Sequence, residues 1–402
     1  MCMHSYLKKI KPDFVIFIFF IILAVYFSFK NGYIISHDTY AMINTFEKII
    51  NQKIYIPSRV PGYFVPEIGV GFLSYYGGSF VLNITSFILL LIGLIFFFLS
   101  LEEKKDKIYL FICLSLSNYI VFKDTIQAED FSWSFFFFSL GLYFFKKKIF
   151  ELSIIFFGLC IGSRLNFSIF IVVLIAYFAL TEKIEIKKRF FILISSFFFG
   201  SLFYLPIWIS NGLNLVWVTG YTDGSNLSDV INIKNWLGRF FYKILNAFGI
   251  AQCIVIFFLL YLKKKKIIEI KNFTFIILTI VANLAVFLYL PLELSYLWVY
   301  IFLIYFLITI NYSKKIIYTL IIMNIFAWFY NFQILKITYK FSEQEYCKGI
   351  YAIDAKFKVH FEKGYFFRIE EDKKLLNCHF INYNTQFDMQ KKFISGDSLS
   401  FN

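Results

Sequence analysis

Long apolar runs separated by short lysine-rich segments are the feature that most limits how this chain can fold. Of its 402 residues, 59% are hydrophobic and 57 are phenylalanine. A soluble protein of this length cannot bury so many apolar side chains in its core. Many of the runs approach the ~20 residues that a helix needs to cross a bilayer. We therefore predict an all-α polytopic membrane protein.

The positions of lysine and arginine predict the topology. The net charge is +14, and the basic residues cluster between apolar runs, which is typical of cytoplasmic loops and not of a nucleic-acid partner. With the basic head (1–13) in the cytoplasm, about 11 transmembrane helices follow and the C-terminus is exoplasmic. The cytoplasmic segments then hold more than twice as many basic residues as the outer loops. The predicted spans are 14–29, 79–100, 108–122, 131–145, 149–163, 165–180, 191–209, 240–262, 273–290, 296–310 and 316–332.

The chain divides into a transmembrane domain (1–332) and a C-terminal exoplasmic tail (333–402). Residues 31–68 form a long first outer loop, in which helical spacing over 40–51 predicts an amphipathic helix that lies on the bilayer or packs on the bundle. In the tail, alternation over 350–367 predicts a small α+β unit or a loosely ordered segment. Cys347 and Cys378 lie in this tail and can pair as a disulfide outside the cell. The composition favours a bacterial inner (plasma) membrane.

Charged side chains avoid the centres of the predicted spans and gather at their outer ends. A transporter more often places ionisable groups at mid-membrane, on broken helices. Charges at the outer ends of the spans instead favour a site at the level of the lipid headgroups. These residues are Asp38, Arg59, Glu67, Lys123, Asp124, Glu129, Asp130, Arg164, Asp223, Arg239 and Glu293.

Asp38 follows the first span directly and precedes the amphipathic helix. One interpretation is an N-terminal cap, because a carboxylate accepts hydrogen bonds from free backbone N–H groups there. The other is a general base at the membrane surface, and the two are compatible. His37 is the only histidine near this position.

Two arginines have both a functional and a structural interpretation. Arg59 precedes the Pro61–Gly62 turn, and Arg164 lies at a tight turn between two apolar runs. Each guanidinium can clamp a phosphate, or it can anchor the chain at the interface.

The remaining candidates are acidic or aromatic. Asp124, Glu129 and Asp130 form a solvated loop, or one of them supplies a second acid or a metal ligand. Glu293 and Tyr296 lie at a later outer turn, where Tyr296 also fits an aromatic belt. The sequence has no metal-ligand spacing, P-loop or dinucleotide fingerprint, so metal use stays unknown and cytoplasmic nucleotide chemistry is not expected.

Four stretches in a characteristic order carry a family resemblance. They are HDTYAMINTFEKI with its early Asp38, SRVPGYFVPE with Arg59 and Tyr63, GLCIGSRLNF with Arg164, and Glu293–Leu297 with a Glu-x-x-Tyr pattern. Over about residues 1–310 this architecture resembles the GT-C superfamily of integral membrane glycosyltransferases. That superfamily includes the protein O-mannosyltransferases and the bacterial lipid A aminoarabinose transferases. Ser295 stands where the family usually has arginine.

The resemblance implies transfer of a sugar, with inversion, from a polyprenyl-phosphate carrier to an acceptor on the non-cytoplasmic face. Asp38 would act as general base on the acceptor hydroxyl, and Arg59 or Arg164 would meet the leaving phosphate. Tyr63, Glu293 and Tyr296 would bind substrate. The expected partners are a polyprenyl-phosphate-linked sugar, a glycan, lipid or protein acceptor, and membrane lipid. A divalent metal is compatible with this chemistry, and the resemblance leaves the use of a cofactor open.

Three other functions remain open. An O-antigen-type polymerase or ligase would favour a large late outer loop, whereas the largest internal outer loop here comes first. A lipid or sugar flippase predicts polar groups deep in the spans and internal symmetry. An inactive assembly subunit predicts that replacement of Asp38 has no effect.

Overall fold

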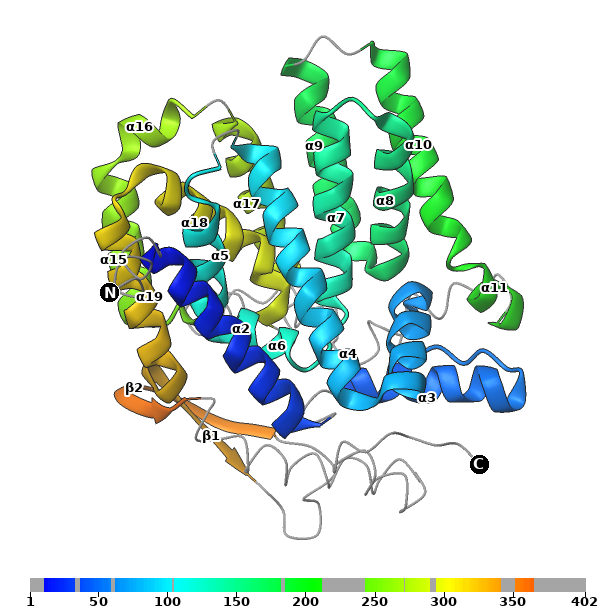
Figure 1. Ribbon diagram of the computed structural model, residues 1–402, viewed down its shortest axis with the longest axis horizontal. Helices are drawn as coiled ribbons and strands as arrows, with labels where there is room; N and C mark the ends of the chain where they lie inside the picture. Colours follow the sequence, from blue (N-terminus) through cyan, green and yellow to red (C-terminus); the bar gives the residue numbers. More distant parts are fainter. Residues whose placement is uncertain are drawn as a thin grey trace, which may run out of the picture.

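The computed structural model describes residues 11–32, 37–58, 62–102, 105–181, 185–211, 243–270, 272–289, 294–340 and 351–364. These residues form a helical bundle that ends in a two-stranded hairpin (Figure 1). The elements in chain order are α2 (Pro12–Asn31), α3 (His37–Gln52), α4 (Phe64–Leu101), α5 (Ile108–Ser117), α6 (Tyr119–Thr125), α7 (Phe131–Lys146), α8 (Phe150–Ser163), η1 (Leu165–Phe167), α9 (Ser168–Thr181), α10 (Ile186–Leu202), α11 (Leu205–Asn211), η3 (Leu245–Ala247), α15 (Ile250–Leu262), α16 (Lys264–Ile268), α17 (Phe273–Tyr289), η4 (Leu294–Leu297), α18 (Trp298–Asn311), α19 (Lys314–Phe329), β1 (Tyr330–Lys340) and β2 (Tyr351–Lys363).

Within the described residues, three helical stretches are long and apolar enough to cross a membrane. They are Pro12–Lys30, Phe64–Leu101 and Leu294–Asn311. Shorter apolar helices accompany them, among them α5, α8, α15 and α17. This set is compatible with an integral membrane protein. The finer prediction of about 11 spans is not confirmed by helix length and stays a prediction.

The centre of the bundle is α18. Every side chain from Trp298 to Thr309 is buried, which is the pattern of a helix surrounded by other helices. The ring of Phe302 lies 4.6 Å from that of Phe135 on α7, and the ring of Phe306 lies 5.6 Å from that of Phe98 on α4. By contrast, α10 and α15 expose large apolar side chains, and we expect these faces to contact lipid. They include Phe190, Phe191, Ile194, Phe198, Ile254, Phe257 and Phe258.

Glycines allow the helices on one side of the bundle to approach closely. A Cβ atom at Gly141 of α7 would lie 2.4 Å from the Phe157 ring of α8, and one at Gly158 would lie 2.2 Å from the Phe199 ring of α10. Small residues at such contacts are typical of helix packing in membranes. This packing brings α7, α8 and α10 side by side (Figure 1).

Helix α4 is longer than the predicted span 79–100, because the chain is already helical from Phe64. The two parts meet at Gly78, whose backbone (φ 67°, ψ −171°) is not helical. Glycine adopts a positive φ without steric cost. The predicted span therefore corresponds to the part of α4 after this kink, and the part before it packs on α3.

The predicted amphipathic helix is present as α3. Its apolar residues Met42 and Ile43 are buried, and Phe46 lies on Gly71 of α4. The apolar face thus packs on the bundle, which is one of the two arrangements expected for it. Close contact at Gly71 ties the position of α3 to the first part of α4.

We expect Gly71→Val to weaken the docking of α3. A Cβ at Gly71 would lie 2.1 Å from the Cβ of Phe46, so the α3 backbone must shift, at a cost of about 1–3 kcal/mol. Faster trypsin cleavage after Lys48 or Lys53 would report this shift. Phe72→Val, at the exposed neighbouring position, is the control, and equal cleavage of both variants would contradict the prediction.

The predicted span 108–122 is broken at Asn118 into α5 and α6. The Asn118 side chain accepts hydrogen bonds from the N–H groups of Ile120 and Val121, and it donates to the Ala247 carbonyl at 2.7 Å and the Tyr305 hydroxyl at 3.3 Å. An asparagine that caps a new helix in this way replaces the backbone bonds lost at the break. Asn324 completes the cluster, because it donates to the Tyr305 hydroxyl at 2.9 Å.

The last helix, α19, ends at Phe329 and not at 332 as predicted. The chain continues directly into β1, which pairs antiparallel with β2 from Tyr330↔Lys363 to Lys340↔Tyr351. Strand structure predicted within 350–367 is therefore confirmed over 351–363. Cys347 and Cys378 lie outside the described residues, so their pairing stays a prediction.

Candidate functional site

Helices α3 and α6 lie at the lower end of the bundle in Figure 1. Arg164 is the centre of a buried cluster with Asp130, Phe131, Tyr63 and Tyr296. It follows α8 in an extended conformation (φ −154°, ψ 117°). One guanidinium nitrogen, Nη2, lies 2.8 Å from Oδ1 of Asp130, and the two side chains are 1% and 0% exposed. A buried ion pair of this kind requires both partners, since either charge alone would be costly.

Three aromatic rings surround the Arg164 guanidinium. Its Cζ atom lies 3.3 Å from the ring centroid of Phe131, 5.0 Å from that of Tyr296 and 5.6 Å from that of Tyr63. Each distance is within the range of cation–π attraction. Phe131 begins α7, Tyr296 lies in η4 and Tyr63 immediately precedes α4. The cluster therefore joins four segments that are distant in sequence.

Two further carboxylates reach the cluster through Ser295. Its hydroxyl lies 2.5 Å from Oδ2 of Asp124, to which it donates, and 3.3 Å from Oε2 of Glu129. Lys123 Nζ lies 3.6 Å from Asp124 Oδ1. Because Ser295 precedes Tyr296, η4 contacts both the arginine and residues 124–130, which we call the acidic loop.

The start of α3 contacts the same acidic loop. Thr39 donates its hydroxyl hydrogen bond to the Gln127 carbonyl at 2.8 Å. The neighbouring Asp38 lies in the first turn of α3 and is half-buried. Negative charge is favourable at a helix N-terminus. Because α3 begins at His37, Asp38 is the second residue of the helix and not its N-terminal cap as predicted. Ala128, the next residue in the loop, has a positive φ of 55°.

The structure therefore joins most of the predicted site residues. Tyr63, Asp130, Arg164 and Tyr296 form the arginine cluster, and Asp124 and Glu129 meet it at Ser295. Asp38 precedes Thr39, which donates a hydrogen bond to the Gln127 carbonyl between Asp124 and Asp130. The predicted residues outside the described part of the chain are Arg59, Asp223, Arg239 and Glu293.

Glu67 contributes a contact network for which the sequence analysis proposed no role. It lies in the first turn of α4 and accepts hydrogen bonds from Tyr55, Ser58 and Tyr63. In the sequence, the only sign of this network is that Glu67 follows Tyr63 of the Pro-Gly-Tyr turn by four residues. A Glu in this position is equally typical of a helix start. Among the described residues, no group of three or more His, Cys, Asp or Glu side chains is arranged to hold a metal ion.

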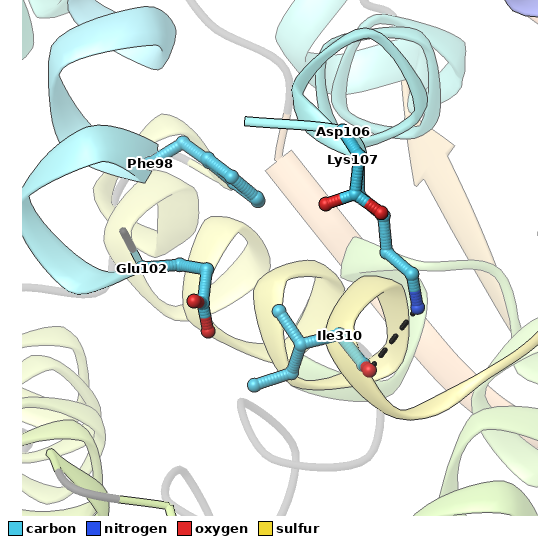
Figure 2. A pocket seen from close by; sticks show the side chains of 5 residues that line it. All are labelled: Phe98, Glu102, Asp106, Lys107 and Ile310. Atoms are coloured by element: carbon cyan, nitrogen blue, oxygen red, sulfur yellow. Dashed lines mark hydrogen bonds between the residues drawn. The ribbon is translucent and has the colours of Figure 1, made fainter. Parts of the chain in front are cut away.

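A separate cavity of about 230 Å³ lies at the opposite end of the bundle. Figure 2 shows its lining, which is Phe98, Glu102, Asp106, Lys107 and Ile310. Lys107 Nζ donates to the carbonyls of Thr309, Ile310 and Tyr312, at 2.8, 3.1 and 3.0 Å. A cation at this position satisfies the last carbonyls of a helix. Lys107 therefore caps α18 and ties it to the start of α5.

The sequence matches no protein-family model, and no curated protein or solved structure is significantly similar to it. The site must therefore be interpreted from its own residues.

Proposed function

We propose that this protein is a membrane glycosyltransferase that moves a sugar from a polyprenyl-phosphate carrier to an acceptor hydroxyl on the non-cytoplasmic face, with inversion. The observation that carries the proposal is the convergence at one end of the bundle. Residues from α3, the α6–α7 loop, the end of α8 and η4 come together there, although long apolar segments separate them in the sequence. About 11 spans, with a cytoplasmic N-terminus in a bacterial inner membrane, belong to the same proposal.

The proposed reaction is a single displacement. The acceptor oxygen attacks the anomeric carbon, the bond from that carbon to the phosphate oxygen breaks, and the acceptor proton passes to the Asp38 carboxylate. Polyprenyl phosphate leaves with the bonding electron pair. A carboxylate can act as this base because it needs only to be within hydrogen-bond reach of the hydroxyl.

The arginine cluster supports the leaving-group side of this reaction. A cation held in place before the reaction stabilises developing negative charge better than one that must reorganise. Asp130 and the ring of Phe131 hold Arg164 in this way. Because Arg164 is 1% exposed, direct contact with a carrier phosphate requires the rings of Tyr63 or Tyr296 to move aside. Arg59 is the other proposed phosphate ligand.

A transfer assay tests the proposal. The purified protein in lipid nanodiscs is given undecaprenyl phosphate bearing radiolabelled glucose, mannose or aminoarabinose, together with an envelope extract as acceptor. We expect label in the acceptor and release of undecaprenyl phosphate with one of these donors. If no donor transfers label and undecaprenyl phosphate does not bind, the proposed function is wrong.

The orientation has its own test. Cysteine introduced in the variants Asp38→Cys and Glu293→Cys should react with an impermeant maleimide added outside intact cells. Asp106→Cys, at the opposite end of the bundle, should react only after the membrane is opened. The reverse pattern would place the proposed site in the cytoplasm and contradict the proposal.

One observation favours a lipid or sugar flippase as a second candidate. The cluster of Asn118, Tyr305 and Asn324 is buried among apolar helices at a helix break. Broken helices with polar groups are typical of transporter binding sites. Transporter function therefore has a structural feature in its favour that the sequence analysis did not find.

For a flippase, we expect Asn324→Leu to abolish translocation of fluorescent polyprenyl phosphate in proteoliposomes. The substitution removes the amide that donates to the hydroxyls of Ser117 and Tyr305, both at 2.9 Å. If the cluster is only structural, stability falls by about 1–3 kcal/mol and wild-type proteoliposomes show no translocation above that of empty ones. Exposed Thr319→Ala on the same helix is the control.

A further inference from the structure

Glu67 is a fully buried carboxylate with four hydrogen-bond donors around it. Its Oε1 atom accepts from the N–H and the hydroxyl of Ser58 at 2.8 and 2.6 Å, and from the Tyr63 N–H at 3.3 Å. Its Oε2 atom accepts from the Tyr55 hydroxyl at 2.5 Å. A carboxylate that is 0% exposed is tolerated only when hydrogen bonds replace its lost hydration. Burial and the Glu67 charge raise the pKa of Tyr55, so the phenol stays protonated and continues to donate.

The donors Tyr55 and Ser58 precede α4 and Tyr63 adjoins its first residue, so Glu67 ties residues 55–58 to the start of α4. Gly62 is held by a contact with another helix. Its φ is +89°, and a Cβ there would lie 2.0 Å from Cδ1 of Ile207 on α11. The chain before α4 is thus held between the Glu67 carboxylate and α11.

This network is connected to the arginine cluster through Tyr63. The N–H of Tyr63 donates to Glu67, while its ring lies 5.6 Å from Cζ of Arg164. A simple helix cap would explain only part of this arrangement. The Glu67 N–H also donates to the Tyr63 carbonyl at 3.0 Å, and such reciprocal bonds are typical of helix starts. The bonds to Tyr55 and Ser58 go to residues outside the helix, so a cap does not require them.

We propose that Glu67 is a positioning residue for the carrier-phosphate side of the site. It orders residues 55–58 and Tyr63 so that they form the wall beside Arg164 against which polyprenyl phosphate binds. Glu67 itself touches neither phosphate nor sugar. This inference rests on the proposed function, and it adds the element that recognises the carrier.

Binding of undecaprenyl phosphate to the protein in nanodiscs tests the inference. We expect Glu67→Gln to weaken this binding by about tenfold or more, because the amide NH₂ cannot accept from the Tyr55 hydroxyl and the bonds from Ser58 and Tyr63 lose their charged acceptor. Glu67→Asp should recover part of the affinity. Ser58→Ala and Tyr55→Phe, which each remove one donor, should weaken binding by smaller factors. If Glu67→Gln does not fold, the affinities of these two variants test the positioning role in its place. Glu151→Gln, at an exposed position in the first turn of α8, should bind as wild type.

Hydrogen exchange and thermal unfolding separate positioning from a purely structural role. In Glu67→Gln we expect faster exchange in peptides covering residues 53–64 and unchanged exchange in α7 and α8. If Glu67→Gln lowers Tm but the folded protein binds undecaprenyl phosphate as wild type does, Glu67 is only a structural cap and the inference is wrong. If wild type itself does not bind, the proposed function fails and the inference falls with it.

Discussion

Replacing Asp38 with asparagine should lower the rate of sugar transfer by about a hundredfold to ten-thousandfold, because the amide cannot take the proton of the acceptor hydroxyl. The fold should survive. Asparagine is as good as aspartate at a helix start, and the lost charge at the start of α3 costs only about 0.3–1 kcal/mol. The change should therefore appear in kcat, with little effect on Tm or on the binding of undecaprenyl phosphate.

Asp106→Asn is the matched control for this substitution. Asp106 is exposed and lies at the other end of the bundle, beside the cavity shown in Figure 2. The same change of charge and shape there should leave transfer within about twofold of wild type, because surface substitutions away from a site have small effects. Equal, measurable rates for Asp38→Asn and wild type would exclude Asp38 as the base and would favour an acid of the 124–130 loop. Absence of transfer by both proteins would favour an inactive subunit.

Replacing Arg164 with methionine should destabilise the protein by about 3–5 kcal/mol, because Asp130 loses the guanidinium that compensates its buried charge. The contacts of the guanidinium with the rings of Phe131, Tyr63 and Tyr296 disappear as well. Equilibrium unfolding in mixed micelles measures this loss. Transfer activity should fall in parallel, since the same side chain supports the acidic loop and the proposed phosphate side.

A double-mutant cycle isolates the ion pair from the other effects of this substitution. The double variant Arg164→Met/Asp130→Leu should lose several kcal/mol less stability than the two single variants lose together. Neither charge is left without its partner in the double variant, and apolar replacements of buried pairs are often tolerated. Arg189→Met, at a half-buried arginine in α10, should cost less than about 1 kcal/mol. If Arg164→Met costs no more than this control, the pair does not hold the cluster together.

Local features of the sequence predicted the helices and several of their ends. The spacing of apolar residues over 40–51 predicts α3, and the lysine-rich breaks mark the ends of α7 and α15. Span 14–29 lies within α2. These predictions succeed because a helix closes its hydrogen bonds within a few residues, so the pattern of one stretch is sufficient.

The breaks within apolar stretches were not predictable in the same way. Residues 108–122 read as one continuous span, yet the chain turns at Asn118 because Tyr305 accepts its hydrogen bond from 187 residues away. Similarly, the helix before Gly78 joins the predicted span 79–100 only because α3 and the first part of α4 pack together. A polar residue in an apolar run does not by itself indicate whether a distant partner is present.

The sequence by itself determined which side chains of the site lie at the ends of helices, because each charged residue must leave the apolar interior. It also placed Asp38 at the start of α3 and Arg164 at the turn after α8. Only the tertiary structure decided that Arg164 pairs with Asp130, that Ser295 meets Asp124, and that Glu67 receives its bonds from residues 55–63. Several acids were available to the arginine, and the pairing depends on the packing of α7 against α8, which brings Asp130 before α7 to Arg164 after α8. No local pattern encodes this contact between helices.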